Sequence, residues 1–267
     1  MTRTALVTGA SSGIGAACSV RLAHAGWRVF AGVRRKGDAP PGTEEILLDV
    51  TDEDQVRAAA ERIGELHGLV NNAGIALAIP LEFIPLDELR RQFEVNVFGQ
   101  VSVTQAFLPH LRRSRGRIVF IGSIAGQSAL PFLGPYAASK HALEAVTDTL
   151  RLELRPFGID VSLVQPGSIK TPIWTKSAHF ADELANGAGA ELAGLYGERI
   201  AAFRSVALRR GANGASPDEV ARVVEGALTT ERPRTRKLVG LDAKFRAGVE
   251  RLPDRLRDRV YERMLLR

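Results

Sequence analysis

Short apolar runs alternate along the chain with longer segments that carry apolar residues at helical spacing. The runs are rich in β-branched and aromatic residues, as in strands buried on both faces, and they lie at 4–8, 28–33, 45–48 and 117–122. The helical patterns predict helices over 13–25, 53–66, 86–113, 136–156 and 217–229, and a last strand follows at 237–240. This alternation predicts an α/β fold, a doubly wound parallel sheet with helices on both faces. We expect a single domain over 1–267, because no repeat or linker interrupts the pattern.

The first predicted strand, Thr4–Thr8, runs directly into a turn with three glycines and then into a predicted helix. Gly9 allows a tight turn, Gly13 lets the backbone approach a pyrophosphate, and Gly15 lets the helix pack closely on the strand. The helix N-terminus offers free N–H groups and a partial positive charge to phosphates. An isolated glycine triplet is often an ordinary turn, but the order strand, turn, helix predicts the dinucleotide site of a Rossmann fold.

Tyr136 and Lys140 stand four residues apart, so they share one face of a predicted helix. A phenol is a poor base at neutral pH, because its reference pKa is about 10. A neighbouring ammonium favours the phenolate, so we expect Lys140 to lower the pKa of Tyr136 and fit it for proton transfer. Ser123 would hydrogen-bond the substrate oxygen and stabilise the charge that develops there. The plainer interpretation is a tyrosine that caps a core helix beside a solvated lysine; Ser123 and Asn96, in register, argue against it.

Further motifs follow one another in order along the chain. They are Thr8–Gly15, Asn71–Gly74, Asn96, Ser123, Tyr136–Lys140 and Pro166–Thr171. Together they resemble the TGxxxGxG, the NNAG, the catalytic asparagine and serine, the YxxxK and the PGxxxT of the classical short-chain dehydrogenases/reductases. The resemblance covers roughly residues 3–240 and implies a Rossmann domain with a seven-stranded sheet. The stretch 136–173 is most similar to retinol and hydroxysteroid dehydrogenases and their bacterial relatives, although most of it serves helix packing.

The resemblance also implies roles for individual residues. Tyr136 would be the acid/base, Lys140 would also bind the nicotinamide ribose, and Asn96 would hold a water that relays protons from Lys140. Thr171 would anchor the nicotinamide carboxamide, and Asp49 would contact the adenine. The residues expected to bind the cofactor are Gly9, Ser11, Ser12, Gly13, Ile14, Gly15, Arg34, Arg35, Asp49, Val50, Asn72, Ala73, Gly74, Tyr136, Lys140, Pro166, Gly167, Ile169 and Thr171.

Val33 occupies the end of the second predicted strand, where relatives that use NAD carry an acidic residue. Arg34 and Arg35 follow it, and two guanidinium groups suit a 2′-phosphate. A solvated basic loop is the plainer interpretation of this pair. Ser12 also weighs against the idea, because another NADP-preferring pattern carries a basic residue just before Gly13. We predict NADP(H) as the cofactor in preference to NAD(H).

Residues 172–215 follow the sixth predicted strand, at the carboxyl edge of the sheet where such folds bind ligands. The segment is rich in alanine and glycine, and its large apolar residues are Ile173, Trp174, Phe180, Leu184, Leu192, Leu195, Tyr196, Ile200 and Phe203. We interpret it, together with Leu130, Phe132 and Leu133, as a mobile apolar lid over a lipophilic substrate. The alternative is that these side chains simply pack on the domain.

The net positive charge of the chain comes from its last part. Residues 231–267 contain 12 Lys+Arg and 6 Asp+Glu, whereas residues 1–230 contain 24 of each sign. Apolar residues recur there at every fourth position: Leu252, Leu256, Val260 and Met264. This predicts a basic amphipathic helix over 244–267, which we expect to pack on its own domain or on a partner subunit. A weak contact with a membrane surface is the second interpretation, and no nucleic-acid binding is expected, because aromatic residues are not interleaved with the basic ones.

The composition narrows the class of protein further. The first predicted strand begins at residue 4, which leaves no room for a signal peptide, and no apolar run approaches the ~20 residues of a membrane-spanning helix. The single cysteine, Cys18, is expected to be a small buried side chain, and without an internal disulfide a reducing cytoplasm is the expected location. The histidines are scattered, so we predict no metal site.

These features predict an NADP(H)-dependent oxidoreductase that interconverts a lipophilic alcohol and its ketone or aldehyde. The alternative from another class is a regulator that senses NADPH without turnover, although a sensor needs none of the residues Asn96, Ser123, Tyr136 and Lys140. A sugar-nucleotide epimerase is a third interpretation, but the TGxxGxxG motif and the larger C-terminal domain of those proteins are missing. The resemblance also implies a homodimer or homotetramer, formed through the helices at 86–113 and 136–156.

Overall fold

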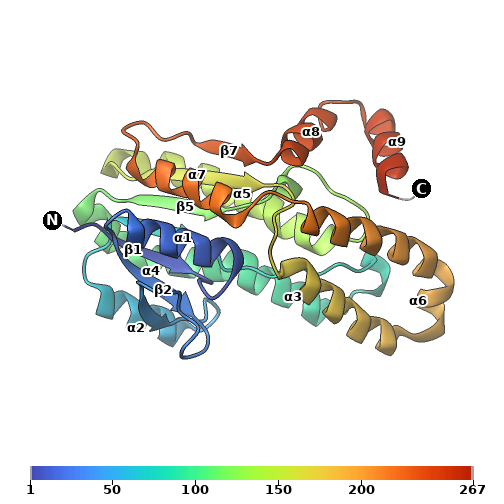
Figure 1. Cartoon of the computed structure of the whole chain (residues 1–267), viewed down its shortest axis with the longest axis horizontal. Coiled ribbons are helices and arrows are strands. Elements are labelled where there is room, and N and C mark those ends of the chain that lie inside the picture. Colours follow the sequence, from blue (N-terminus) through green and yellow to red (C-terminus); the bar gives the residue numbers. More distant parts are fainter. Residues whose placement is uncertain (1, 266–267) are drawn as a thin grey trace.

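Within residues 2–265, which the computed structural model describes apart from the side chains of 174, 176, 178–190 and 265, seven parallel strands form one sheet (Figure 1). The strands are β1 (Thr4–Thr8), β2 (Arg28–Val33), β3 (Glu44–Leu47), β4 (Gly68–Asn71), β5 (Arg117–Ile121), β6 (Asp160–Pro166) and β7 (Arg236–Val239). Their order across the sheet is β3-β2-β1-β4-β5-β6-β7. The predicted Rossmann class is confirmed. This order reverses between β1 and β4, and such a reversal opens a crevice at the carboxyl ends of the strands.

The sheet separates two apolar cores. Helices α2 (Glu53–Ile63), α4 (Gly99–Ser114) and α5 (Gly134–Leu154) cover one face, and α1 (Gly13–His24) and α7 (Pro217–Thr229) cover the other (Figure 1). Side chains of β1 alternate between the cores, with Leu6 in the first and Ala5 and Val7 in the second. Because both faces are covered, the strands are continuous apolar runs in the sequence.

Cys18 of α1 is fully buried in the second core, as expected for a small packing side chain. Burial raises the pKa of its thiol to about 12, so the group stays protonated. Thiolate chemistry at this position is therefore disfavoured.

The helix predicted over 86–113 is irregular in the structure. Regular helix α3 (Leu86–Phe93) leads into a π-helical turn, η2 (Glu94–Phe98), before α4 begins. A π turn closes i→i+5 hydrogen bonds and so contains one residue more than an α turn. Apolar periodicity does not reveal such a turn, because the stripe resumes after it. The turn contains Asn96, whose side chain is fully buried.

The predicted lid segment forms a long helical element, α6 (Ile173–Ala212), which doubles back so that its second arm returns toward the sheet (Figure 1). Leu192 and Phe203 are buried, whereas Leu195 is exposed. The side chains of the other large apolar residues in the first arm lie outside the described ones: Trp174, Phe180 and Leu184. Short 3-10 turns complete the connections at η1 (Leu81–Phe83), η3 (Ile124–Gly126) and η4 (Arg155–Phe157).

The prediction of one helix over 244–267 is wrong. The chain forms two shorter helices, α8 (Leu241–Val249) and α9 (Asp254–Leu265). Pro253 lies between them, and a proline cannot continue a helix because it lacks an N–H and clashes with the preceding turn.

The two C-terminal helices pack on the rest of the chain, which was the favoured interpretation. Val249 and Tyr261 are buried in a cluster with Leu133 and Phe203. Two members of the predicted apolar stripe, Leu252 and Leu256, remain exposed. In the described part of the chain, no helix has the length and apolar character needed to cross a membrane.

Candidate active site

The turn after β1 is so tight that it leaves little room for a side chain at its three glycine positions. Gly9 has φ +64°, and a Cβ there would lie 2.9 Å from Ala73 Cα. Gly13 has φ +58°, and its Cβ would lie 3.0 Å from Cγ2 of Thr171. A Cβ on Gly15 would lie 2.3 Å from the carbonyl oxygen of Gly9. Glycine therefore keeps the turn narrow and leaves its backbone uncovered.

The N-terminus of α1 is free to meet an anion. Ser12 is the N-cap residue, yet its side chain makes no capping hydrogen bond. The first N–H groups of a helix need partners from outside the helix, and an anion is a favourable one. The turn and helix thus fit the pyrophosphate of the predicted dinucleotide.

Hydrogen bonds tie the end of β1 to the segment after β4. The hydroxyl of Thr8 accepts from the backbone N–H groups of Asn72 and Ala73, both at 3.0 Å. The Asn72 amide in turn donates to the carbonyl oxygens of Thr8, at 2.9 Å, and Gly9, at 3.1 Å. Asn71 points the other way and donates to Thr104 of α4 at 2.8 Å. The Asn-Asn pair thus fixes the two edges of the crevice to each other.

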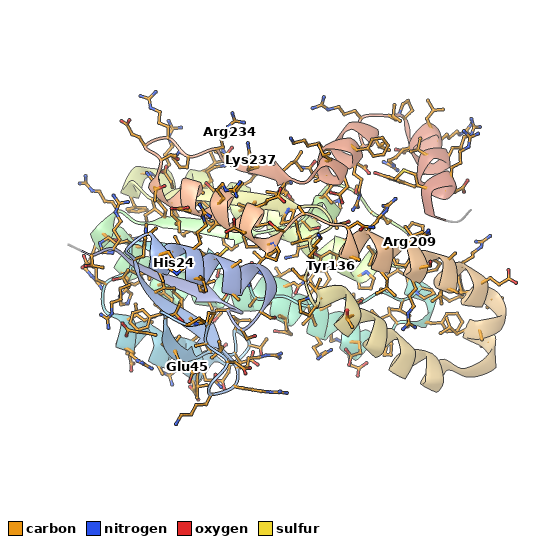
Figure 2. The ribbon with its side chains drawn as sticks, in the orientation of Figure 1. His24, Glu45, Tyr136, Arg209, Arg234 and Lys237 are labelled. Atoms are coloured by element: carbon orange, nitrogen blue, oxygen red, sulfur yellow. The ribbon has the colours of Figure 1, made fainter. Side chains whose placement is uncertain are left out.

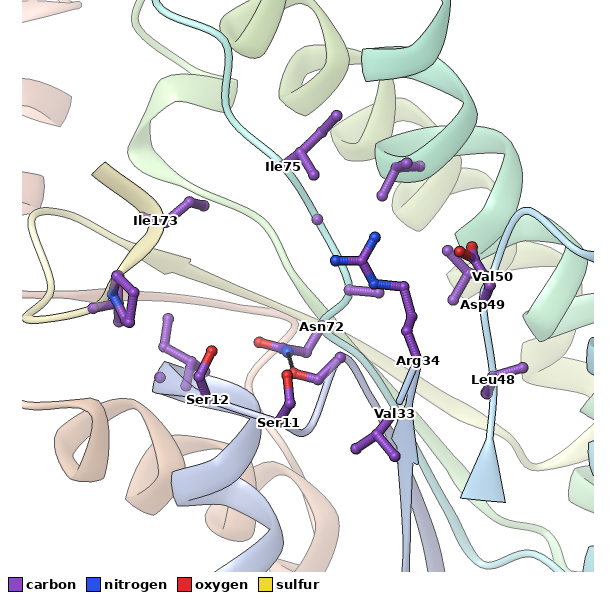
Figure 3. Close-up of a pocket in the computed structure, with 18 residues that line it drawn as sticks. Ser11, Ser12, Val33, Arg34, Leu48, Asp49, Val50, Asn72, Ile75 and Ile173 are labelled. Carbon is purple, nitrogen blue, oxygen red and sulfur yellow. Dashed lines mark hydrogen bonds between the residues drawn. The ribbon is translucent and has the colours of Figure 1, made fainter. Parts of the chain in front are cut away.

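A cleft of about 190 Å³ opens above this turn (Figure 3). It is lined by Gly9, Ser11, Ser12, Gly13, Ile14, Val33, Arg34, Leu48, Asp49, Val50, Asn72, Ala73, Gly74, Ile75, Val95, Thr171, Pro172 and Ile173. Most of the predicted cofactor-binding residues therefore meet in one place. Gly15 lies beneath the turn, and Arg35 does not line the cleft.

The far end of the cleft carries one arginine and one aspartate. Figure 3 shows the exposed side chain of Arg34 reaching over the cleft from the end of β2. The last residue of β2 is Val33, and Arg34 follows it, so no acidic side chain stands at this strand end. Asp49 follows β3, and its Oδ1 accepts from the N–H and the hydroxyl of Thr51 at 3.0 and 2.8 Å. The charge presented at the end of β2 is therefore positive.

A second cavity, of about 90 Å³, continues the cleft toward α5. Ser123, Tyr136 and Lys140 line it together with residues shared with the cleft, among them Ile14 and Thr171. Besides Tyr136 and Lys140, three predicted cofactor-binding residues that the cleft does not contain are found here: Pro166, Gly167 and Ile169. In Figure 2, Tyr136 lies where the sheet meets α6. The structure therefore joins most of the predicted cofactor residues with Ser123, Tyr136 and Lys140 in one continuous site.

Tyr136 is buried, with 7% of its surface exposed, and it hydrogen-bonds Ser123. Ser123 has extended backbone at the end of β5 and accepts from the N–H of Ala125 at 3.1 Å. Burial raises the pKa of Tyr136, while the hydrogen bond from Ser123 and the positive charge of Arg246 lower it. The expected lowering by Lys140 is not found: the groups that lower the pKa are Ser123 and Arg246, and burial outweighs both.

Lys140 is also buried, and burial lowers its pKa to about 8 against the opposing charge of Glu144. Its Nζ donates to the carbonyl oxygen of Ile121 at 2.8 Å and lies 5.8 Å from the ring centroid of Tyr136. Tyr136 and Lys140 do share a helix face, but the ammonium is directed at the end of β5.

Asn96 holds the loop after β4 in place. Its Oδ1 accepts from the N–H of Ile75 at 2.9 Å, and its Nδ2 donates to the carbonyl oxygen of Ile75 and to the hydroxyl of Ser139, both at 3.0 Å. The hydroxyl of Ser139 donates to the carbonyl oxygen of Tyr136 at 2.8 Å. Asn96 thereby connects the cleft loop to the start of α5. The side chain does not itself line either cavity.

Sequence reasoning missed three residues of this site. Gln92 repeats the action of Asn96 one turn earlier, accepting from the N–H of Leu77 and donating to the carbonyl oxygen of Ile75. Ser139 connects Asn96 to α5, and Arg246 of α8 places a buried positive charge near Tyr136. The four-residue spacing of Gln92 and Asn96 was a signal in the sequence, whereas nothing in the sequence pairs Arg246 with Tyr136.

An aromatic cluster joins the second arm of α6 to the segment that precedes Tyr136. Tyr196 makes edge-to-face contacts with Phe83 and Phe132, at centroid distances of 5.9 and 6.2 Å. Phe132 also contacts Phe203 at 5.5 Å. The hydroxyl of Tyr196 donates to Oε2 of Glu82 at 2.7 Å. The predicted lid residues Tyr196 and Phe203 thus pack on Phe132, on the segment that leads into Tyr136, and the cluster itself lines neither cavity.

Comparisons with known proteins place these features in one family. The model of the short chain dehydrogenase family matches residues 3–182. An NADPH-dependent 3-dehydrocapnine reductase of Ornithobacterium rhinotracheale is 37% identical and covers 97% of this chain and 96% of its own. Retinol dehydrogenase 5 of Mus musculus is 36% identical, over 90% of this chain and 81% of its own. A crystal structure of a short chain dehydrogenase from Burkholderia cenocepacia in complex with NADP superposes with a TM-score of 0.75 at 29% identity, over 99% and 98% of the two chains.

Proposed function

Because this chain belongs to the short chain dehydrogenase family and is an oxidoreductase of alcohol or carbonyl groups, we propose that it uses NADP(H) and acts on a lipophilic substrate. The observation that carries the proposal is the continuity of the two cavities, which brings the dinucleotide cleft to the buried Tyr136–Ser123 pair. When bound, the nicotinamide supplies or accepts the hydride.

Each residue of the site has a part in moving the proton. Tyr136 gives the proton of its hydroxyl to the carbonyl oxygen in reduction and takes it back from the alcohol in oxidation. Ser123 holds the same oxygen and stabilises the charge that develops on it. Lys140, with a pKa of about 8, can exchange a proton at neutral pH and so restore Tyr136. Asn96 keeps the Ile75 loop and the start of α5 in register.

The preference for NADP(H) rests on the charge at the end of β2. Arg34 reaches over the cleft and Val33 replaces the acid that would bind ribose hydroxyls, so a 2′-phosphate is favoured there. The reductase of Ornithobacterium is NADPH-dependent by name, and the Burkholderia structure contains NADP. Both relatives support the same preference in this chain.

The lipophilic substrate is proposed from the apolar side chains around Tyr136. Ile173 lines the catalytic cavity, and the aromatic wall of Phe83, Phe132, Tyr196 and Phe203 includes the segment that leads into Tyr136. An apolar wall beside a few polar groups is the usual form of a site for a lipophilic molecule. Retinol dehydrogenase 5, a relative, is named for such a molecule.

We further propose a homo-oligomer that is formed through α4 and α5. Phe98, Leu152 and Phe157 are 57%, 63% and 49% exposed near this pair of helices. Exposed large apolar side chains of this kind mark surfaces that another subunit covers. The exposed Leu252 and Leu256, between basic residues, support a weak contact with a membrane surface as a separate proposal.

An assay at the reduced-nicotinamide absorbance band tests the main proposal. NADPH and NADH are offered with retinal, steroid ketones, aliphatic aldehydes and small polar ketones, and Tyr136→Phe is the control. Turnover of bulky lipophilic carbonyls that is absent in the control supports every part of the proposal. Turnover confined to small polar carbonyls overturns the lipophilic part, and NADPH binding without turnover of any carbonyl revives the sensor interpretation.

A further inference from the structure

A third cavity, of about 490 Å³, lies between α8, the end of α6 and the segment after β6. Its polar wall includes Arg210, Arg246, Asp242 and Glu219, and its apolar wall includes Phe245. Ser168 also lines it and is the neighbour of Gly167, which lines the catalytic cavity. The two cavities are thus adjacent along the segment after β6.

The two carboxylates of this cavity are already engaged. Asp242 accepts from the N–H of Ser168 at 2.7 Å, and a Cβ on Gly167 would lie 2.2 Å from its Oδ1. Glu219 accepts from the N–H of Ser216 at 3.0 Å, as part of the box that caps α7. Both acids therefore serve local structure.

The two arginines are not matched in this way. Arg246 is 8% exposed, and its Nη2 donates to the carbonyl oxygen of Ser128, at 3.1 Å, and to the Ser128 hydroxyl. Its Nε is buried and has no hydrogen-bond partner. Tyr261 contacts it through a hydroxyl, and the charge of Asp242 in the same cavity raises the pKa of Arg246 against the lowering by burial. Among the residues described, no carboxylate lies within ion-pair distance of Arg246 or Arg210, so neither guanidinium is directly paired.

Arg246 is also close to the reacting groups. Ser128, which it holds, lies on the segment between Ser123 and Tyr136. Its charge is near enough to lower the pKa of Tyr136, while burial lowers the pKa of Arg246 itself. A ligand group bound by Arg246 would therefore be close to the carbonyl that Tyr136 protonates.

We propose that Arg246, with Arg210, binds an oxyanion of the substrate, so that the substrate is an acidic amphiphile whose carbonyl or alcohol lies beside Tyr136 and whose apolar part meets the aromatic wall. An oxyanion would supply the acceptor that the buried Nε lacks, and a guanidinium recognises carboxylates and related oxyanions through paired hydrogen bonds. The cavity rejects a neutral analogue by leaving the same buried charge unpaired. This inference rests on the proposed function and names the substrate class within it.

The test compares a medium-chain keto acid with its methyl ester, using NADPH and the full chain. We expect kcat/KM to favour the acid by about tenfold or more, as for hydrogen bonds to a charged group. Arg246→Gln should remove most of this preference, Arg210→Gln should reduce it severalfold, and Arg246→Lys should retain part of it. Lys244→Gln, a neutralisation on the exposed side of the same helix, is the matched control and should keep the full preference.

The outcomes separate this inference from the proposed function. If the ester and the acid react equally in the wild type, or if both slow by the same factor in Arg246→Gln, the oxyanion site is refuted while the oxidoreductase stands. If neither reacts, turnover of the carbonyl panel decides the proposed function, and calorimetry of decanoate and decanol with the protein–NADP⁺ complex decides the oxyanion site. Binding of decanoate alone that Arg246→Gln abolishes supports the oxyanion site, and equal binding of the two probes refutes it.

Discussion

Nζ of Lys140 donates a hydrogen bond of 2.8 Å to the carbonyl oxygen of Ile121, the last residue of β5. The bond is made by an amine that is nearly free of solvent and whose pKa has fallen to about 8. Burial therefore disfavours the charged form of Lys140 in the folded protein and not in the unfolded chain.

This lysine should make the folded state more stable as the pH rises. Between pH 8 and 10.5 the unfolded chain keeps the proton that the folded protein has lost, so raising the pH favours folding. We expect Lys140→Met to gain stability relative to the wild type at pH 7, and this gain to shrink by about 2 kcal/mol at pH 10. Urea unfolding of both proteins at the two pH values measures it. A difference that does not change with pH would show that Lys140 is not desolvated.

The raised pKa of Tyr136 predicts that the rates of reduction and oxidation depend differently on pH. Reduction needs the protonated phenol and should stay constant through neutral pH, whereas oxidation needs the phenolate and should rise with pH. Tyr136→Phe should lower kcat by a factor on the order of 10² to 10⁴ with NADPH affinity retained. Initial rates in both directions, with fluorescence titration of NADPH, check these expectations. Substantial residual activity in the phenylalanine variant would remove Tyr136 from its assigned role.

Arg34 and Arg35 provide a matched pair for the cofactor preference, because only Arg34 lines the cleft. Arg34→Asp should lower kcat/KM for NADPH at least tenfold and improve that for NADH, since the new carboxylate repels the 2′-phosphate and can bind ribose hydroxyls. Arg35→Asp makes the same charge change outside the cleft and should have a much smaller effect. Equal effects of the two substitutions would indicate that both arginines act only through long-range electrostatic attraction, and that Arg34 makes no direct contact with the 2′-phosphate.

Two glycine-to-alanine substitutions should change stability in opposite directions. The Cβ of Gly15→Ala would lie 2.3 Å from the carbonyl oxygen of Gly9, so we expect a loss of about 2 kcal/mol or more and weaker NADPH binding. Gly226 lies within α7 with nothing within 4 Å of an added Cβ, and Gly226→Ala should gain about 0.5–1 kcal/mol. Thermal unfolding of both variants makes the comparison. Tolerance of Gly15→Ala would contradict the tight packing of the turn.

The scaffold of the site could be predicted from the sequence because local signals mark it. The three glycines follow a strand directly, and Tyr136 and Lys140 are spaced by one helical turn, so each motif carries its own structural context. The structure brings Ser123, Tyr136 and Lys140 into one cavity for the same reason, since each lies at or just after the carboxyl end of a strand or at a helix start. The broken C-terminal helix shows the limit of periodicity: Pro253 outweighed the four-residue stripe.

Long-range relationships could not be predicted in this way. Arg246 meets Ser128 across 118 residues, and the sequence around it is one of many basic stretches. The pKa of Tyr136 likewise depends on how deeply the phenol is buried, which is a property of the packed protein and not of the YxxxK spacing. Burial therefore raises the pKa of Tyr136, where the spacing alone predicts that it is lowered.

The π turn over Glu94–Phe98 sets the number of residues between α3 and the buried face of α4, and it contains Asn96. Removing the single codon for Val97 would let α3 and α4 join as one regular helix, because a π turn differs from an α turn by one residue. The buried face of α4 that carries Phe107 would keep its orientation, but the residues within the turn would change position and Asn96 would lose its hydrogen bonds with Ile75. Single-residue deletions should therefore be far more damaging here than most substitutions. This turn is expected to tolerate a change of residue type better than a change in the number of residues.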